Sequence, residues 1–369
     1  MLRSFLLRRL RPYLDKHSYF REAAVQLEMG AGLVQHSVAS VLPIVIRPTP
    51  RRLTIAITAS CNYACVGCRY GRDFMPGHYL KLNMVRTLLD DAAAAGMTTV
   101  RFYGGEPLVH PDLAEMIRHA NNAGILPYIT TNGYLLDRKI DKLYAAGLRI
   151  ATLGYYGWGS AYDEYTSRAG AFEHLCKGLA AVRSHCGKDF KLQLNFLLMR
   201  RSCSLEELHR AWDLARTHDM TIQVDLVHYS LPYFTEGPNR VLQFTAADEQ
   251  VIRRFTEELL RLKSSEPGRI PESETSIKSI PDWLLKGPAM RVPCDAYEMI
   301  WVGADGTVQL CYVTFPIGNL HQARLRELLY NDAHKAAAKG CFRLECPNCH
   351  CERNTRIAKH LPSRLHYSH

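Results

Sequence analysis

Three cysteines follow a short apolar run, and their spacing limits what this chain can fold into more than any other feature. Cys61, Cys65 and Cys68 lie directly after residues 53–58, which read as a buried strand. Thiolates are preferred ligands of iron–sulfur clusters, and a four-iron cluster held by three thiolates keeps one iron open for a ligand that is not protein. Zinc is the alternative, but it prefers four ligands in paired short spacings. The triplet therefore predicts a loop that holds a cluster suited to chemistry.

Strands and helices are expected to alternate along the chain. Apolar runs bounded by turn residues predict strands at 53–58, 98–103, 125–130, 148–154, 190–199 and 220–229. Helical periodicity predicts helices at 83–96, 111–124, 137–147, 171–185 and 204–218. Such alternation implies a parallel sheet in an α/β fold, and α/β barrels place their sites at the carboxyl ends of the strands. The cysteine triplet stands at such an end.

Three further segments that contain candidate site residues follow later strands. Residues 104–107 read Gly-Gly-Glu-Pro, residues 130–133 read Thr-Thr-Asn-Gly, and Arg168 lies in the segment 162–172. Together with the cysteine triplet, these segments resemble the signature of the radical S-adenosylmethionine (SAM) enzymes. The resemblance covers roughly residues 51–352.

This resemblance implies both a cofactor and a reaction. Cys61, Cys65 and Cys68 would bind a 4Fe-4S cluster, and SAM would bind its open iron. Reductive cleavage of SAM would then give a deoxyadenosyl radical that abstracts a hydrogen from the substrate. The residues that the resemblance assigns to SAM are Gly104, Gly105, Glu106, Thr131, Asn132 and Arg168.

Two of these residues have an expected partner on SAM. Glu106 would accept a hydrogen bond from the ammonium group, and Arg168 would hold the carboxylate with its planar fork. A solvated surface arginine is the alternative for Arg168. Gly67 departs from the family, since many members carry an aromatic residue just before the third cysteine. The surface under the adenine would come from elsewhere, with Tyr63, Tyr70 and Phe102 as candidates.

A second group of cysteines lies near the C-terminus. Cys294 precedes a hairpin predicted around Asp305 and Gly306, because this pair favours a tight turn. The pattern resembles the auxiliary-cluster extension called SPASM, or its shortened form, twitch. The resemblance implies a second 4Fe-4S cluster on Cys294, Cys311, Cys346 and Cys349, with Cys341 or Cys351 able to replace one of them. The alternative is a zinc ribbon on Cys311, Cys346, Cys349 and Cys351.

The resemblance also implies a domain organisation. The fold would be a partial (β/α)6 barrel, similar to a TIM barrel, with a small cysteine-rich C-terminal domain that contains a β-hairpin. The expected divisions are a basic amphipathic extension at 1–52, the barrel at 53–264, a linker at 265–293, a twitch-like domain at 294–352 and a basic tail at 353–369.

Charge is concentrated in the first segment. Residues 1–52 hold nine Lys or Arg and three Asp or Glu, a net +6 of the chain's formal +10. We expect a helix packed on the barrel with a solvated basic face; the alternative is peripheral contact with an anionic membrane surface. The sequence shows no nucleic-acid recognition module. It shows no secretory signal or membrane-spanning run, and clusters need reduced thiols, so a cytoplasmic location is expected.

The expected activity is that of an oxidoreductase. We expect hydrogen abstraction from a small molecule or natural-product intermediate, with the auxiliary cluster assisting oxidation or coupling. The alternatives are modification of a peptide, a redox-neutral change such as epimerisation, and a non-catalytic binding protein stapled by metal. A reductant such as flavodoxin or ferredoxin is the expected protein partner.

Overall fold

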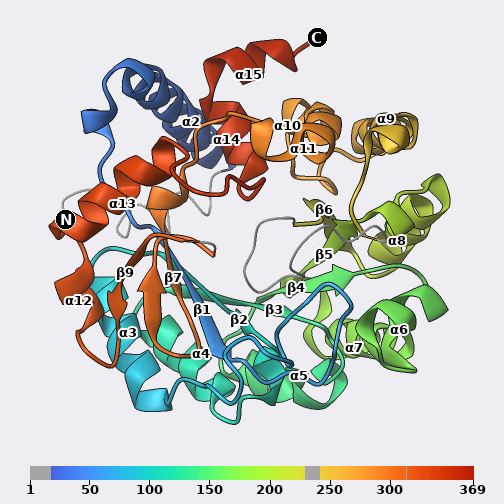
Figure 1. Cartoon of the computed structure of the whole chain (residues 1–369). Coiled ribbons are helices and arrows are strands. Elements are labelled where there is room, and N and C mark those ends of the chain that lie inside the picture. Colours follow the sequence, from blue (N-terminus) through green and yellow to red (C-terminus); the bar gives the residue numbers. More distant parts are fainter. Residues whose placement is uncertain (1–17, 229–241, 313) are drawn as a thin grey trace.

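A single nine-stranded sheet forms the centre of the molecule (Figure 1). The computed structural model describes residues 18–228, 242–312 and 314–369. The strands lie in the order β6-β5-β4-β3-β2-β1-β7-β8-β9. Those of the barrel are β1 (Arg52–Thr58), β2 (Thr99–Gly104), β3 (Leu126–Thr131), β4 (Ile150–Tyr155), β5 (Lys191–Leu198) and β6 (Met220–Leu226). All six run parallel to their neighbours, which confirms the predicted α/β fold.

Helices between the strands cover the outer side of the curved sheet (Figure 1). They are α3 (Leu82–Ala94), α4 (Leu113–Asn122), α5 (Leu136–Ala145), α6 (Ser160–Thr166), α7 (Ala171–Cys186) and α8 (Leu205–Thr217). Their apolar faces are buried; on α3 these include Val85, Leu88 and Leu89. Ser204 caps α8 by accepting a hydrogen bond from the backbone of Glu207 at 3.1 Å. The alternation predicted from periodicity is therefore present, with element ends that differ by a few residues.

The C-terminal hairpin continues this same sheet. β7 (Met299–Val302) pairs in parallel with β1, so β1 lies between β2 and β7. β8 (Thr307–Gln309) and β9 (Pro316–Asn319) follow in antiparallel order. Gly306 turns the hairpin with φ of +82°, and Asp305 accepts a hydrogen bond from the backbone of Thr307 at 3.0 Å. The predicted hairpin is thus confirmed, and its first strand extends the barrel.

At the opposite edge of the sheet, side chains form hydrogen bonds with the backbone of the edge strand β6. The backbone N–H of Val224 donates to Glu272 at 2.8 Å, and Arg353 donates to the Val224 carbonyl at 3.0 Å. Glu272 and Arg353 form a buried ion pair with each other. An exposed edge strand offers unpaired N–H and C=O groups to other chains. Here Glu272 and Arg353 bind the N–H and C=O groups of Val224, so another chain cannot pair with them.

The segment 265–293 differs from the expected linker. It follows α9 (Glu249–Ser265) and contains α10 (Glu274–Lys278) and α11 (Ile280–Lys286). Ile277, Ile280 and Trp283 within it are fully buried. These apolar side chains pack into the core, so the segment is part of the folded body.

The segment 353–369, expected as a basic tail, is helical in the structure. It forms α14 (Arg353–Lys359) and α15 (Leu361–His366). Lys359 is buried and pairs with Asp295 at 2.8 Å and Glu298 at 3.0 Å. Buried charges persist in folded proteins when they are paired, and the acidic partners lie some sixty residues earlier in the chain.

Three more helices complete the described chain: α2 (Ser18–Val41), α12 (Leu325–Leu328) and α13 (Asp332–Phe342). His36 of α2 hydrogen-bonds the Tyr297 hydroxyl at 2.9 Å, and α2 packs beside α14 (Figure 1). The basic run 1–11 lies outside the described residues, so the prediction for it stays a prediction. Within the described part of the chain, no helix combines the length and the apolar character needed to cross a membrane.

Candidate functional site

The cysteine triplet forms a turn directly after β1. The backbone N–H of Cys68 donates to the Cys65 carbonyl at 3.1 Å, and the backbone N–H of Tyr63 points at the Cys61 sulfur, 3.4 Å away. All three thiols are partly exposed. Burial raises the pKa of Cys61 to about 12 and that of Cys68 to about 11, so the free thiols are protonated at neutral pH. Metal binding would displace these protons.

The donor set suits a multi-iron group better than a single ion. Among residues 18–228, 242–312 and 314–369, no three His, Cys, Asp or Glu side chains converge closely enough to hold one metal ion. A four-iron cluster does not require such convergence, because each thiolate binds a different iron. Three thiols on one short turn therefore fit a cluster with one open iron.

Two glycines bring the end of β2 onto the cysteine loop. The backbone N–H of Gly105 donates to the Thr58 carbonyl at 2.8 Å, and that of Glu106 donates to the Ser60 carbonyl at 2.9 Å. A Cβ atom at Gly104 would lie 2.3 Å from the Thr58 oxygen, and one at Gly105 would lie 2.2 Å from the Ser60 oxygen. Glycine is thus needed at both positions, because the backbone at the end of β2 lies against the backbone of the segment after β1 and leaves no room for a Cβ atom.

We expect Gly105→Ala to disrupt the cysteine loop. Its Cβ would overlap a backbone oxygen, and overpacking of this kind costs about 1–3 kcal/mol. Iron in the triplet and the melting temperature should both fall. Gly268→Ala is the matched control, because a Cβ there meets nothing within 4 Å. A Gly105→Ala protein with unchanged iron and melting temperature would contradict this account.

Glu106 joins the ends of β2 and β3. Its carboxylate is fully buried. Oε1 accepts from the Leu108 backbone at 2.9 Å and the Thr131 hydroxyl at 2.7 Å, and Oε2 accepts from the Asn132 backbone at 2.7 Å. Burial raises the pKa of Glu106 to about 7 against the pull of these donors. Three predicted site residues are therefore in direct contact.

Asn132 and Arg168 extend this network to the cysteine loop. The Asn132 amide donates to the Asn62 side chain at 2.8 Å and lies 3.9 Å from the Cys61 sulfur. Arg168 donates to the Asn62 carbonyl at 2.9 Å and to the Tyr134 hydroxyl at 3.0 Å. Arg168 is thus bound to the loop and is not a solvated surface arginine.

Sequence reasoning missed Asn62 and Tyr134. Each follows a motif residue within two positions, and that proximity was the available signal. Asn62 contacts both Asn132 and Arg168, so it holds two of the predicted SAM residues against the cysteine turn.

The surroundings of Gly67 explain its departure from the family pattern. A Cβ there would lie 3.0 Å from Leu242 and 3.1 Å from the Tyr165 hydroxyl, so the space beside it is filled. Of the aromatic candidates, Phe102 is fully buried in the core. Tyr63 packs edge-on against Tyr134, with ring centres 5.8 Å apart.

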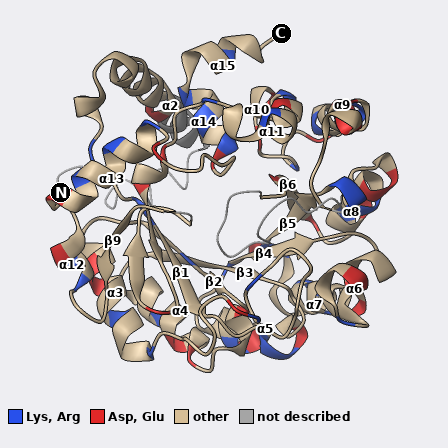
Figure 2. Ribbon diagram, viewed as in Figure 1, with Lys and Arg blue, Asp and Glu red and all other residues tan. Residues whose placement is uncertain are grey.

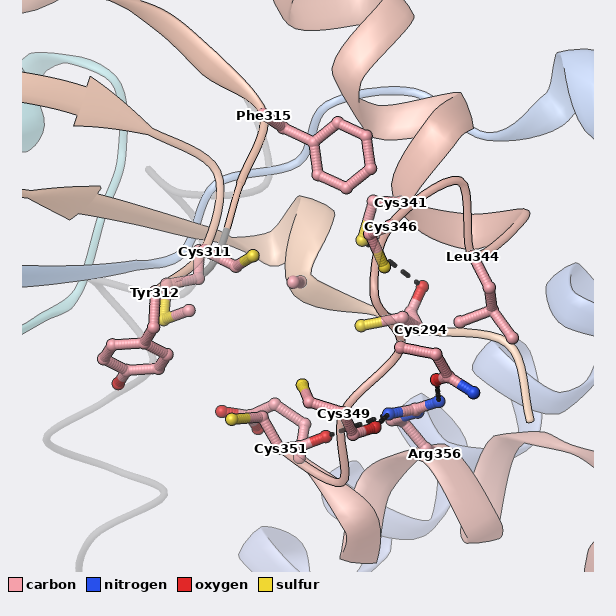
Figure 3. Close-up of a pocket in the computed structure, with 14 residues that line it drawn as sticks. Cys294, Cys311, Tyr312, Phe315, Cys341, Leu344, Cys346, Cys349, Cys351 and Arg356 are labelled. Carbon is pink, nitrogen blue, oxygen red and sulfur yellow. Dashed lines mark hydrogen bonds between the residues drawn. The ribbon is translucent and has the colours of Figure 1, made fainter. Parts of the chain in front are cut away.

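The C-terminal cysteines line one pocket, shown in Figure 3. They come from the segment before β7, the end of β8, α13 and the loop before α14. The six residues are Cys294, Cys311, Cys341, Cys346, Cys349 and Cys351. The structure therefore brings together the predicted quartet and both of its predicted substitutes.

Hydrogen bonds distinguish some of these thiols. The Cys341 sulfur lies 3.9 Å from the Cys294 carbonyl, and the Cys351 sulfur lies 3.6 Å from Nε2 of His228 at the end of β6. A hydrogen bond from Cys351 and the charge of Arg356 lower the pKa of Cys349 to about 7. Cys349 thus ionises more readily than an ordinary thiol.

A buried cation stands beside this pocket. Arg356 is fully buried and donates to the carbonyls of Cys349 and Cys351 and to the Asn348 side chain (Figure 3). The hydrogen bonds of its guanidinium go to uncharged oxygens, and its Nε has no hydrogen-bond partner. Asp295 attracts the Arg356 guanidinium, but this carboxylate is already paired with Lys359. Because a buried charge is costly unless it is compensated, the pocket suits an anionic group. A cube held by four thiolates is anionic, so these residues fit an auxiliary cluster.

Comparison with known proteins places the barrel in a family. Residues 55–216 match the model of the Radical SAM superfamily. An AdoMet-dependent heme synthase of Methanosarcina barkeri is 32% identical over 176 residues, covering 47% of this chain and 49% of the relative. A GTP 3',8-cyclase of Chlorobaculum tepidum is 34% identical over 173 residues, covering 46% of this chain and 51% of the relative. The aligned region spans about half the length of these curated relatives.

Solved structures share the fold over a longer stretch. Streptococcus suis SuiB, bound to its precursor peptide SuiA, matches with a TM-score of 0.62 at 16% identity. The match covers 82% of this chain and 69% of that chain. It therefore extends the likeness in fold beyond the barrel and into the cysteine-rich region.

Proposed function

We propose that this protein, a radical SAM enzyme by the domain at residues 55–216, oxidises or couples an unactivated carbon of a small molecule with the help of an auxiliary cluster. One observation carries the proposal. The cysteine triplet, Glu106, Asn132 and Arg168 come from four separate segments and form one connected network at the strand ends. Such a network positions a cofactor, whereas a structural metal staple needs only its ligands.

The residues divide into two cofactor sites. Cys61, Cys65 and Cys68 would hold the 4Fe-4S cluster that binds SAM. The auxiliary 4Fe-4S cluster would be held by four of the C-terminal cysteines, namely Cys294, Cys311, Cys346 and Cys349. When bound, these groups and SAM would supply a deoxyadenosyl radical for hydrogen abstraction and an acceptor for the electron that substrate oxidation releases.

Glu106 and Arg168 would position SAM. Oε2 of Glu106 accepts one hydrogen bond and Oε1 accepts two, so Oε2 has capacity left for an ammonium donor. Arg168 already contacts the cysteine turn through Asn62, which places a guanidinium beside the loop where SAM would bind. Gly104 and Gly105 would support the site through their close backbone contacts with the cysteine loop, and Thr131 through its hydroxyl, which donates to Glu106.

We expect Arg168→Lys and Glu106→Gln each to weaken SAM binding by about one to two orders of magnitude. Hydrogen bonds to charged groups contribute about 1.5–3 kcal/mol each, and lysine cannot reproduce the fork of arginine. Calorimetric titration of the reconstituted protein with SAM measures the affinity. Arg118→Lys, an exposed arginine on α4, is the control. If both site variants bind SAM with the affinity of the parent protein, Glu106 and Arg168 do not position SAM.

The substrate is proposed from the relatives. The curated relatives that match the barrel are named for heme synthesis and GTP cyclisation, which are reactions of small molecules. Peptide modification is the second candidate, because SuiB shares the longer fold and is bound to a precursor peptide. The reductant would be a flavodoxin or ferredoxin.

The proposal is tested with protein purified without oxygen. On reduction it should convert SAM to methionine and deoxyadenosine, and metabolites that accumulate in a strain lacking the protein should include the substrate. Deuterium from that substrate should appear in deoxyadenosine. A protein with its full complement of iron that never cleaves SAM would instead be a metal-stapled binding protein.

A further inference from the structure

An apolar stripe runs along the outer face of α2. Leu27, Val34, Val38 and Val41 are 76%, 64%, 46% and 86% exposed. Their spacings of seven, four and three residues place all four on one side of the helix. Leu42 and Ile44, 54% and 63% exposed, continue the apolar surface past the end of the helix.

The opposite side of α2 is the one that packs on the protein. His36 bonds Tyr297, Ala39 is fully buried, and a Cβ at Gly32 would lie 3.2 Å from the Lys359 side chain. The orientation of α2 is therefore set by these contacts. The stripe cannot turn inward without breaking them.

Most of the stripe, from Val34 to Ile44, lies in a stretch without charge, whereas Leu27 is followed by Glu28, which pairs with Arg51. From residue 29 to residue 46 the sequence contains no Lys, Arg, Asp or Glu. Helices α8 and α9 carry residues of both signs (Figure 2), and Arg216 of α8 and Glu249 and Arg253 of α9 are exposed. Their exposed apolar residues, Leu205 at the start of α8 and Val251 on α9, stand singly. Contiguous exposed apolar surface marks interaction sites, whereas single exposed residues do not.

Positive charge flanks the stripe on both sides in the sequence. Residues 1–17, directly before α2, contain five Lys or Arg and one Asp. Arg47, directly after the apolar surface, is exposed. An apolar face beside basic residues matches a bilayer that has anionic headgroups above its acyl chains.

We propose that the outer face of α2 docks this protein on an anionic phospholipid surface. Leu27, Val34, Val38 and Val41 enter the interface between headgroups and acyl chains, and the positive charge that flanks them in the sequence attracts the anionic headgroups. Binding of such a helix increases with the apolar area it buries and with its attraction to anionic lipids. The proposal is independent of the reaction, because no residue of the two cysteine sites takes part in it.

Vesicle flotation with the full chain tests the proposal. The protein should float with vesicles of phosphatidylcholine and phosphatidylglycerol, and should stay behind with phosphatidylcholine alone. Added salt should weaken the binding, because it screens headgroup attraction. The double variant Val34→Asp, Val38→Asp should lose at least about tenfold in binding, because charge on the apolar face opposes insertion. Arg8→Ala with Arg9→Ala should lose part of it.

Val251→Asp is the matched control, because it puts the same charge on an exposed valine of α9 and should bind like the parent. Unchanged iron content and melting temperature show that each variant is folded. Failure of the parent chain to float with the anionic vesicles would overturn the proposal. So would a dimer in solution that the double variant converts to a monomer, because a second copy would then cover the stripe.

Discussion

Replacing Cys65 with alanine is expected to abolish reductive SAM cleavage while the C-terminal cluster stays in place. Two thiolates on the loop cannot hold a cube and keep one iron open, since each thiolate binds its own iron. Deoxyadenosine formation, measured by mass spectrometry after anaerobic reduction, should fall to background. The same result is expected for Cys61→Ala and Cys68→Ala.

Cys176→Ala is the control for this experiment. Cys176 lies on α7, is partly exposed and belongs to neither cysteine group. Its variant should cleave SAM like the parent protein. If the Cys65→Ala protein still makes deoxyadenosine at the parent rate, the triplet is not the SAM-binding site.

Replacing Cys294 with alanine is expected to separate SAM cleavage from product formation. The parent protein should hold about eight irons, the sum of two four-iron clusters of the kind that thiolates hold, and the variant about four. Deoxyadenosine should still form, but oxidised product should not, because the electron from the substrate would lack its acceptor. Iron analysis and product analysis of one preparation measure both quantities.

The choice of four ligands among six cysteines can be read from the same experiment. With Cys294, Cys311, Cys346 and Cys349 as ligands, Cys341→Ala and Cys351→Ala should each keep the second cluster. If either variant loses iron, the replaced cysteine is itself a cluster ligand, in place of one member of the quartet. A zinc atom in place of the second four irons would favour the zinc ribbon and contradict the expected loss of product.

Local sequence patterns predicted the barrel because its elements are local. Except for the short helix α6, each strand and α-helix from residue 52 to residue 226 is marked by its own periodicity and by turn residues at its ends. The triplet, Glu106, Asn132 and Arg168 were predicted as site residues for a related reason: each lies in a short motif just after an element. The contacts between them cross long stretches of chain, and only the structure shows these contacts.

Distant partners explain what could not be predicted. The pairing of β7 with β1 joins residues almost 250 positions apart, and no local signal encodes it. Arg356 and Lys359 read as parts of a basic tail, and no pattern in the sequence indicates that they pair with the Cys349 carbonyl and the Asp295 carboxylate. The Ser- and Pro-containing segment 265–293 read as a linker, although Ser273 caps α10 and Ser276 accepts a hydrogen bond from Arg353.

Helix α14 couples the closed edge of the barrel to the cysteine pocket. Its first residue, Arg353, covers the β6 edge together with Glu272, and Arg356, one turn later on the same helix, lines the pocket. A displacement of α14 would uncover the Val224 carbonyl and remove the buried cation from the pocket at the same time. Open edge strands pair readily with other chains. Loss of order in the cysteine pocket is therefore expected to make the barrel prone to aggregation.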